Sequence, residues 1–454
     1  MSRAVGNLGS RGRGAMTAYK DFFAGKRVTL MGLGLLGRGV GDAAFLAELG
    51  AQLLVTDRKD KAALASSLGQ LSAFSNIQYV LGEHRVADFQ NTDMVIKAAG
   101  VPLDSPYIKA ARDAGVPVYM STALFAKFAR QIGATIVGIT GTRGKSTVTH
   151  MIHHALARAG RRGHLGGNVR GLSTLALLPD VRAGEIAVLE LDSWQLQGFG
   201  DLRMSPKVAV FTNLLMDHLN YYPDMDAYFA DKANVFRYQN ANDALIVGAQ
   251  IRDRIVYSRP PAPAVVPEPI PADWQLRIRG AHNRENAALA AAAVRSLRLP
   301  EQQVRDGLES FQPVEGRLQF VAELRGVKIY NDNNATTPDA TVAALQAFAG
   351  ERVVLITGGS DKGIPLEALA DEINKRASAV VLLPGTGTER LAPLLKSAVK
   401  AKDMTEAVRI AFSNARAGDV LLLSPGFASF GLFTNEYERN DAFLQALREP
   451  EGSN

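Results

Sequence analysis

A glycine-rich turn between an expected strand and an expected helix limits most strongly what this chain can be. Residues 139–147 read Ile-Thr-Gly-Thr-Arg-Gly-Lys-Ser-Thr, and an apolar, strand-like run at residues 134–139 leads into them. Apolar residues then recur at helical spacing through residues 148–159. Such a turn can direct backbone N–H groups at phosphate oxygens, and the start of the helix adds its positive end. The turn therefore predicts a nucleotide-phosphate site on an α/β framework.

The side chains of this turn suit the chemistry of ATP. Lys145 supplies a cation for the outer phosphates, and Ser146 supplies a hydroxyl for Mg²⁺. The strict mononucleotide pattern has about four residues between its first glycine and the Gly-Lys pair. Here five residues follow Gly138 and two follow Gly141. We therefore predict a variant phosphate loop that binds ATP, the alternative being a turn that contains Gly-Lys-Ser by chance.

Size and composition exclude several classes of protein. The 454 residues suffice for two or three domains, 47% of them are hydrophobic, and no run approaches the ~18 apolar residues of a membrane span. Cysteine is absent, which excludes disulfides and thiolate metal sites and fits a reducing cytoplasm. The net charge of +6 includes Arg3, Arg11 and Arg13, in an opening segment without the apolar stretch of a secretion signal. We expect a disordered tail at residues 1–15, unless Met16 is the true start, and no nucleic-acid or membrane partner.

Strand-like and helix-like segments alternate along the chain in three blocks, which predicts an α/β protein of three domains. We expect residues 16–125 to form a Rossmann-like domain, residues 126–313 a central ATPase domain and residues 314–454 another Rossmann-like α/β domain. Residues 260–271 contain six prolines and are expected to form a loop or an edge excursion. The strand-like runs of the third block are residues 328–330, 353–356, 379–383 and 420–423.

A second glycine turn opens the first block. Residues 32–37 read Gly-Leu-Gly-Leu-Leu-Gly after a short apolar run, and Asp57 follows the last glycine by 20 residues. This is the dinucleotide-binding fingerprint, in which the acid contacts ribose hydroxyls. The residues alone leave three alternatives open: NAD, another nucleotide, and a turn without a ligand.

Three polar positions of the second block gain interest from the phosphate loop. Glu190 ends an expected strand, His218 lies beyond the end of another, and Lys232 lies on an expected helix over residues 226–236. Beside Ser146 at one sheet edge, Glu190 and His218 would offer ligands to Mg²⁺. Each also has a simpler interpretation, as a solvent-facing carboxylate, a loop histidine and a surface lysine respectively.

Three histidines on the helix after the phosphate loop are a weaker signal. His150 and His154 have metal-ligand spacing, with His153 beside them. They lie off the apolar face of that helix, so we expect a solvent-facing set rather than a metal site.

Together these segments resemble one family, the ATP-dependent Mur ligases of peptidoglycan synthesis. The matching motifs follow the family's order over nearly the whole chain beyond residue 26, and the set is highly specific although no single motif is. The motifs are Gly-Ile-Thr-Gly-Thr-Arg-Gly-Lys-Ser-Thr at 138–147, Gly-Gly-Asn at 166–168, Leu-Glu-Leu-Asp-Ser-Trp-Gln at 189–195, Asp-His within 213–220, Gly-Ala-His-Asn-Arg-Glu-Asn at 280–286, Gly-Arg at 316–317, Asn-Asp-Asn-Asn-Ala-Thr at 331–336, Gly-Gly-Ser-Asp-Lys at 358–362 and Leu-Ser-Pro-Gly-Phe-Ala-Ser-Phe at 423–430.

The resemblance implies a fold, a reaction and its substrates. The first domain would hold the UDP end of the substrate, the central domain ATP, and a mobile third domain the incoming amino acid. The nearest branch of the family adds D-glutamate to UDP-N-acetylmuramoyl-L-alanine through an acyl phosphate, with ATP and Mg²⁺, and a cytoplasmic monomer is expected. The acyl phosphate forms when ATP phosphorylates the alanine carboxylate, and the amine of glutamate then displaces phosphate.

By position, the resemblance also implies roles for single residues. The residues that match the family's catalytic positions are Lys145, Glu190, His218 and Lys232. Those that match its ATP site are Gly141, Thr142, Arg143, Gly144, Lys145, Ser146, Thr147, Asn283, Arg317 and Asp332. Those that match its UDP-substrate site are Leu35, Leu36, Asp57, Arg58, Asn168 and His218. Those that match its glutamate pocket are Thr336, Lys362, Ser429 and Phe430. Those that match its metal site are Ser146, Glu190, His218 and, if carbamylated, Lys232.

The sequence departs from the family pattern at four positions. Arg143 replaces the usual Asn of the phosphate loop, and Asp192 replaces a usual Ser near the metal site. Asn334 replaces a common Lys, and Glu436 falls near a usual pocket Phe. The last two changes bear on the amino acid that is bound more than on the type of reaction.

Several rival functions remain at this point. The nearest are a ligase for L-glutamate, another Mur step and folylpolyglutamate synthase, although the first block is a complete nucleotide-binding unit that folate ligases lack. More remote are an NAD-dependent oxidoreductase, which leaves the phosphate loop unexplained, and a non-catalytic nucleotide-binding regulator. The joint presence of Lys145, Glu190, His218 and Lys232 argues against the regulator.

Overall fold

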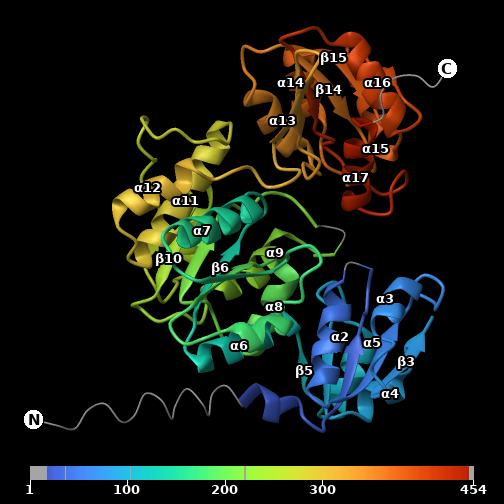
Figure 1. Cartoon of the computed structure of the whole chain (residues 1–454), viewed down its shortest axis with the longest axis vertical. Helices are drawn as coiled ribbons and strands as arrows, with labels where there is room; N and C mark the ends of the chain where they lie inside the picture. The colour runs from blue at the N-terminus through green and yellow to red at the C-terminus, as the bar shows by residue number, and fades with distance from the viewer. Residues whose placement is uncertain (1–17, 36, 103, 219–220, 449–454) are drawn as a thin grey trace, which may run out of the picture. The chain divides into compact units, whose positions relative to one another are not determined.

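The computed structural model describes residues 18–448 apart from 36, 103 and 219–220, so the expected tail, Met16 and Leu36 lie outside the described residues. The described chain folds into three mainly parallel sheets with helices between the strands, which confirms the predicted α/β class (Figure 1). It divides into two compact units. The first two sheets share one unit, together with Leu289–Gly307, and the third sheet belongs to the other, together with Pro269–Ala288.

The first sheet carries the turn of residues 32–37 at its centre. Its described strands all run parallel in the order β3-β2-β1-β4-β5. The chain passes from β1 through β2 to β3 on one side and then crosses to β4 on the other side of β1. The glycine turn after β1 therefore lies at the switch point, where open α/β sheets bind ligands. The strands are β1 (Arg27–Met31), β2 (Gln52–Asp57), β3 (Ile77–Leu81), β4 (Met94–Lys97) and β5 (Val118–Tyr119), and the helices are α2 (Arg38–Glu48), α3 (Ala65–Gln70), α4 (Val86–Gln90) and α5 (Pro106–Asp113).

The central sheet is also parallel throughout its described strands, in the order β11-β10-β9-β6-β8-β7. The proline-rich segment contributes only the two-residue edge strand β11, as the sequence predicted. The strands are β6 (Thr135–Thr140), β7 (Gly163–Gly167), β8 (Ile186–Glu190), β9 (Val208–Phe211), β10 (Ala244–Val247) and β11 (Ala264–Val265). The helices are α6 (Ser121–Ile132), α7 (Lys145–Arg158), α8 (Ser193–Asp201), α9 (Met225–Lys232) and α10 (Arg252–Tyr257), with short 3₁₀ turns at Leu175–Asp180, Ala233–Val235 and Ala249–Ile251. Two more helices follow in sequence, α11 (Ala281–Ser296) and α12 (Glu301–Glu309).

The third sheet differs from the other two by one antiparallel strand. Its order is β12-β13-β17-β14-β15-β16, and only the β12–β13 pair among the described strands is antiparallel. Alternate residues of β14 enter separate cores, Val353 and Leu355 on one face and Val354 and Ile356 on the other, because strand side chains alternate. The strands are β12 (Gln319–Leu324), β13 (Val327–Asn331), β14 (Val353–Thr357), β15 (Ala377–Leu382), β16 (Val399–Lys400) and β17 (Val420–Leu423), and the helices are α13 (Pro338–Gln346), α14 (Glu367–Arg376), α15 (Thr386–Leu391), α16 (Met404–Asn414) and α17 (Glu436–Ala446), with a 3₁₀ turn at Ala392–Leu394.

One continuous core joins the first two sheets. Helix α6 supplies Leu124, Phe125 and Phe128, and the same cluster includes Leu30 of β1 and Leu189 of β8. All five side chains are buried. This shared apolar burial explains why the first two blocks form a single unit.

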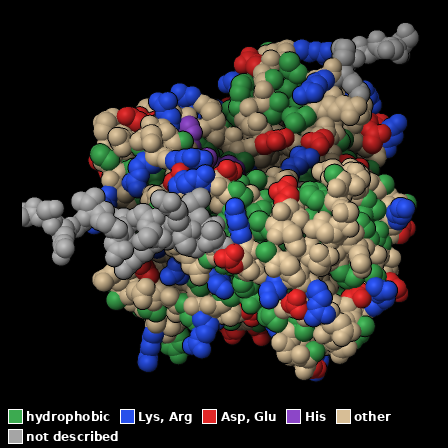
Figure 2. Space-filling model, turned by 60° about the horizontal axis from the view of Figure 1, so that its bottom comes forward, with side chains coloured by type: hydrophobic (Ala, Val, Ile, Leu, Met, Phe, Trp, Pro, Cys, Tyr) green, Lys and Arg blue, Asp and Glu red, His purple; other side chains and the backbone are tan. Residues whose placement is uncertain are grey.

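The surface carries both signs of charge. Figure 2 shows Lys and Arg side chains interspersed with Asp and Glu on the face that it presents. Among the described helices, none combines the length and the apolar character that a bilayer crossing requires.

A buried carboxylate marks the junction between the first two sheets. Asp42 of α2 accepts a 2.5 Å hydrogen bond from Ser173 Oγ, and a β-carbon added to Gly41 would lie 2.6 Å from Ser173 Cβ. Burial raises the pKa of Asp42 to about 6, while hydrogen bonds from Ser173 and Ser121 oppose the rise. The junction is therefore tight enough to exclude water from an acid.

We expect Asp42→Asn to stabilise the first unit above about pH 6 and to change little near pH 4. The folded-state pKa of about 6 exceeds the ordinary value of 3.8, so this group favours folding below that ordinary value and loses the advantage as pH rises through 6. An uncharged Asn avoids the loss, which is worth about 1–3 kcal/mol. Thermal unfolding of variant and wild type across this pH range is the measurement, and a difference that is independent of pH would contradict the assignment.

Candidate functional site

The turn after β6 has a shape that only glycine accommodates well. Gly141 has a φ of 139°, and Gly144, with a φ of 81°, is the residue before α7. A β-carbon on Gly141 would lie 1.9 Å from Thr212 Oγ1. The helix begins at Lys145, three residues earlier than the apolar spacing predicted, so Lys145, Ser146 and Thr147 form its first turn.

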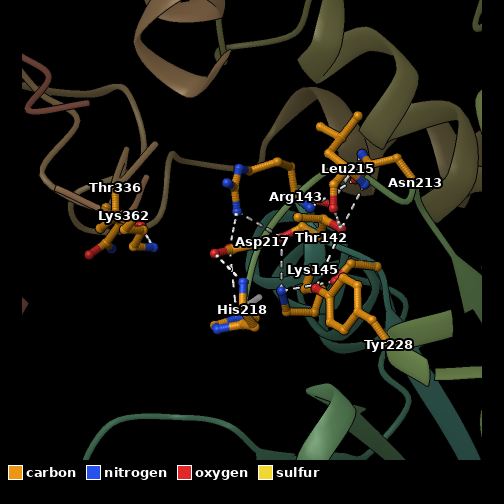
Figure 3. Close-up of polar contacts among 12 residues, drawn as sticks. Thr142, Arg143, Lys145, Asn213, Leu215, Asp217, His218, Tyr228, Thr336 and Lys362 are labelled. Atoms are coloured by element: carbon orange, nitrogen blue, oxygen red, sulfur yellow. Dashed lines mark hydrogen bonds and ion pairs between the residues drawn. The ribbon is translucent and has the colours of Figure 1, made fainter. Parts of the chain in front are cut away.

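The side chains of this turn are held by the turn itself and by the loop after β9 (Figure 3). Lys145 Nζ donates to the carbonyl oxygens of Gly141 at 3.1 Å and Thr142 at 3.0 Å. Thr142 Oγ1 accepts from the Leu215 N–H at 2.9 Å and lies 3.5 Å from the Tyr228 hydroxyl. The Lys145 amine therefore lies over the bend of the loop, where a phosphate group would meet it.

Arg143, a departure from the family pattern, is part of the same cluster. Its N–H donates to Asn213 Oδ1 at 2.9 Å, and its guanidinium lies 3.1 Å from Asp217 Oδ2. His218 Nε2 lies 3.7 Å from that same oxygen. The buried Asp217 carboxylate is thus a close counter-charge for the added charge of Arg143. Through Asp217, the structure also brings Arg143 and His218 together (Figure 3).

Lys232 is the least exposed of the candidate side chains. It is 1% exposed, which excludes the interpretation as a surface lysine. Its Nζ donates to the Gly141 carbonyl at 2.8 Å and lies 4.7 Å from the centre of the Tyr228 ring. Burial, followed by repulsion from Lys145, sets the pKa of Lys232 well below the usual lysine value. The lowered pKa makes the neutral, nucleophilic form of this amine easier to reach than in an ordinary lysine.

Glu190 ends β8, as predicted, and is buried rather than solvent-facing. Asn168 follows the neighbouring strand β7, and its Nδ2 lies 3.4 Å from Glu190 Oε1. Asp192 begins α8 by accepting a 2.7 Å hydrogen bond from the Gln195 N–H. Burial raises the pKa of Asp192. The departure at this position therefore serves as a helix cap close to the site.

His218 is held by its backbone and by aromatic neighbours. Its φ of 57° is uncommon for a residue with a side chain. Its ring centre lies 5.0 Å from that of Trp194 and 5.9 Å from that of Tyr228. The histidines of α7 are different: His150 Nδ1 lies 2.8 Å from the Ser146 carbonyl, and His153 Nε2 lies 3.2 Å from the Gly163 carbonyl. Both are half-buried, so the expectation that they face solvent was wrong in part.

A magnesium site would need more than acids and imidazoles. In the described residues, no three His, Asp or Glu side chains are arranged to hold a metal. Glu190 and His218 supply two such ligands at most, so the Ser146 hydroxyl and a carboxylate formed on Lys232 would have to complete the set. The buried Lys232 amine, with its lowered pKa, fits that requirement.

The glycine turn that begins at Gly32 is held in place by Asp57, the acid that the fingerprint predicted would contact ribose hydroxyls. Asp57 Oδ2 accepts from the N–H groups of Leu33 at 2.9 Å and Gly34 at 3.0 Å, and its Oδ1 accepts from the Lys59 N–H at 2.9 Å. The carboxylate therefore closes the turn. Leu35 is 47% exposed at the tip of the turn, and Arg58 is exposed beside Asp57.

The second unit holds the remaining ATP-site candidates. Asp332, at the end of β13, accepts from Ser424 Oγ and from the Leu318 N–H, each at 3.0 Å. Burial raises the pKa of Asp332 to about 7, against the charge of Arg317 and these hydrogen bonds. Arg317 donates to the Asn334 carbonyl at 3.2 Å. Asn283, near the start of α11, is buried and donates to the Arg279 carbonyl at 2.7 Å.

The glutamate-pocket candidates come from three loops of the second unit. Lys362 Nζ lies 3.4 Å from Thr336 Oγ1 (Figure 3). The Lys362 loop pairs with the loop of Ser429 and Phe430 through backbone hydrogen bonds between Ser360 and Ala428. Ser429 is buried, whereas Phe430 is 61% exposed. The structure thus groups these four candidates on loops that contact one another.

The other two departures lie beside these loops. Asn334 Nδ2 donates to the Glu315 carbonyl at 3.2 Å, and the Glu436 carbonyl accepts from Asn333 Nδ2 at 2.8 Å. Neither contact supplies the cation that a lysine at position 334 would provide.

Arg439, which contacts the loops of the candidate pocket, was not indicated by the sequence. It is 1% exposed on α17 and donates to Asn333 Oδ1 and to the carbonyl oxygens of Asn333 and Phe427, at 2.8–3.0 Å. Burial lowers the pKa of Arg439 to about 10. It therefore fastens together the loops that carry Thr336 and Ser429. A lone arginine on an amphipathic helix gives no signal of this in sequence.

Comparison with known proteins covers the same three segments. Family models match residues 26–120 as the N-terminal domain of MurD-like Mur ligases, 139–260 as the Mur ligase middle domain and 316–427 as the glutamate ligase domain of Mur ligases. The UDP-N-acetylmuramoylalanine–D-glutamate ligase of Roseiflexus sp. (strain RS-1) is 37% identical, over 93% of this chain and 98% of the relative. The enzyme of the same name from Anaeromyxobacter dehalogenans is 38% identical, over 94% and 98%.

Solved structures show the same fold at lower identity. The UDP-N-acetylmuramate–alanine ligase of Thermotoga maritima superimposes with a TM-score of 0.62 at 18% identity, covering 93% of this chain and 99% of that one. Folylpolyglutamate synthase of Mycobacterium tuberculosis gives a TM-score of 0.56 at 16% identity, covering 73% and 94%.

We expect Gly141→Ala to destabilise the protein more than Gly160→Ala. Both glycines have positive φ, 139° and 70°, but only at Gly141 would the new methyl group collide with a neighbour, Thr212. Overpacking of this kind costs about 1–3 kcal/mol, in addition to a backbone strain that is greater at a φ of 139° than at 70°. Differential scanning calorimetry compares them, and equal unfolding temperatures would contradict the close approach of Thr212.

Proposed function

The chain belongs to the Mur ligase family of ATP-dependent peptidoglycan precursor ligases, and we propose that it joins D-glutamate to UDP-N-acetylmuramoyl-L-alanine. The observation that carries this proposal is sequence similarity to D-glutamate ligases over nearly the whole chain, including the segment that holds the fingerprint turn. The match at residues 26–120 assigns that turn to a Mur ligase domain rather than to an NAD-dependent enzyme.

The phosphate loop would bind ATP through its backbone and its lysine. Gly141, Thr142, Arg143 and Gly144 form the bend, and Ser146 and Thr147 add hydroxyls in the first turn of α7. Lys145 would exchange its two loop carbonyl contacts for the outer phosphates and offset the charge of the transferring phosphoryl group. Within the second unit, Asn283, Arg317 and Asp332 are the candidates for contacts to the nucleotide.

Lys232 would serve the metal after reaction with carbon dioxide. Its neutral amine attacks CO₂, an N–C bond forms, one proton leaves to solvent, and the product is a carbamate with one negative charge. The low pKa of the buried Lys232 amine supports this step because only the neutral form reacts. Ser146, Glu190, His218 and the carbamate would then hold Mg²⁺, which lowers the charge repulsion of phosphoryl transfer.

The nucleotide-sugar substrate would lie along the first unit. Leu35 offers an exposed apolar surface for the base, and Asp57 and Arg58 lie beside it, with Leu36 assigned by sequence alone. By their positions in the family pattern, Asn168 and His218 would contact the sugar end, and Asn168 Nδ2 lies 3.4 Å from Glu190 Oε1. This direction would bring the alanine carboxylate to the phosphate loop, where ATP would phosphorylate it.

The amino acid would bind between Thr336, Lys362, Ser429 and Phe430. Lys362 supplies the cation for the side-chain carboxylate of glutamate. The amine of the amino acid would then attack the acyl phosphate; the amide bond forms, phosphate leaves, and the amine gives up a proton. Because Asn334 and Glu436 leave this pocket with less positive charge than the family pattern, L-glutamate or another Mur amino acid is the alternative to test.

We expect phosphate release from ATP only when UDP-N-acetylmuramoyl-L-alanine and D-glutamate are both present with Mg²⁺. Parallel reactions with D-glutamate, L-glutamate, meso-diaminopimelate and L-lysine identify the amino acid, and mass spectrometry of the product confirms the new amide bond. Lys145→Ala should lower turnover at least about a thousandfold, because it removes a charge that acts on the transferring group. The proposal would be rejected if this variant turned over at the wild-type rate, or if none of the four amino acids supported ATP cleavage.

We expect Lys362→Ala to raise the KM for the amino acid about 10–100-fold with a smaller change in kcat, because it removes one charge-assisted contact to a carboxylate. The KM for ATP should not change. Lys402→Ala, which removes an exposed lysine of the same unit, is the matched control. An amino-acid KM equal to that of wild type would show that the pocket lies elsewhere.

A further inference from the structure

Arg38 stands where a helix disfavours positive charge. It is the first residue of α2, directly after Gly37, and no side chain caps the start of this helix. The first turn of α2 also has no acidic residue. Because the helix dipole is positive at this end, a cation here is unfavourable on its own. The glycines already account for the shape of the turn, so Arg38 calls for another explanation.

The guanidinium of Arg38 is also incompletely satisfied. Its Nε is shielded from water and has no hydrogen-bond partner in the described part of the chain, an uncommon state for a buried polar atom. The charge of Arg38 favours the ionised form of two buried carboxylates, Asp42 and Asp192, and so opposes the rise in their pKa values. Each has closer partners, Ser173 and the Gln195 N–H respectively, and Arg38 is the weakest of the influences on either acid.

Arg38 lies between the two ends of the proposed substrate path. On one side is the glycine turn that Asp57 closes. On the other is the loop that follows Asn168, since a β-carbon on Gly37 would lie 3.5 Å from the Gly171 backbone. A ligand that runs from the glycine turn to Asn168 must therefore pass the first turn of α2.

We infer that Arg38 binds the diphosphate of the nucleotide-sugar substrate and makes the first unit prefer a nucleoside diphosphate to an uncharged nucleoside. The inference rests on the proposed function. The diphosphate is the only part of such a substrate that carries charge between its base and its sugar. An anion at this place would pair with the guanidinium and with the open N–H groups of α2, and it would reverse the unfavourable charge at the helix end. Arg38 is thus a binding residue that lowers stability until the ligand arrives.

The test compares UDP with uridine on the full-length protein by isothermal titration calorimetry. Arg38→Met keeps the aliphatic stem and removes the charge together with the Nε atom. We expect the Kd for UDP to rise about tenfold or more, about 1.4 kcal/mol, and the Kd for uridine to change less than about twofold. Arg38→Lys should retain part of the preference for UDP, and the unfolding temperature of ligand-free Arg38→Met should equal or exceed that of wild type.

The matched control removes an arginine from the start of β1, the strand that leads into the glycine turn before Arg38. Arg27 begins β1 and pairs with Asp93 on the surface, so Arg27→Met should leave the ratio of the two Kd values unchanged. An unchanged ratio in Arg38→Met, or an equal loss of affinity for UDP and uridine, would overturn the inference. A wild-type protein that binds neither UDP nor UDP-N-acetylmuramoyl-L-alanine would instead overturn the proposed function, so the two failures are distinguishable.

Discussion

Parallel pairing of β6, β8 and β9 is the constraint on which the candidate site depends. Because these strands run in one direction, their carboxyl ends meet at one edge of the central sheet. β6 delivers the phosphate loop, β8 delivers Glu190, and the chain after β9 delivers Asp217. The same edge covers Lys232, whose amine satisfies the Gly141 carbonyl. Removal from water changes an ordinary lysine into a weakly basic amine, so the packing of the sheet creates the chemistry.

Apolar runs predicted most of the strands because buried parallel strands are apolar on both faces. The apolar run before the phosphate loop and the runs of the third block all correspond to strands. In the third block, β12 and β16 were not predicted, since β12 lies at a sheet edge with half-exposed or exposed side chains and β16 has only two residues. In the other two sheets, β3, β7 and β10 were not predicted either. Helix α7 begins earlier than its apolar stripe because the phosphate loop, not hydrophobic burial, sets where it starts.

The candidate site was predictable in its motifs and not in its contacts. Spacing identified the two glycine turns and Lys145, because tight turns restrict which residues fit them. It gave no indication that Asp192 caps α8, that Arg439 fastens two loops or that Lys232 is buried. Those properties arise between segments far apart in sequence. A charged residue has the same appearance in sequence whether the fold leaves it in water or encloses it.

The dual role of Asp57 affects how nucleoside recognition can be dissected. The carboxylate that would meet ribose hydroxyls also accepts three backbone N–H groups, two of them from the glycine turn. Replacing it would distort the turn and alter ligand affinity together, whichever contact matters more. Altered ligands separate the two effects. A deoxyribose analogue leaves the protein scaffold intact and interrogates only the hydroxyl contact.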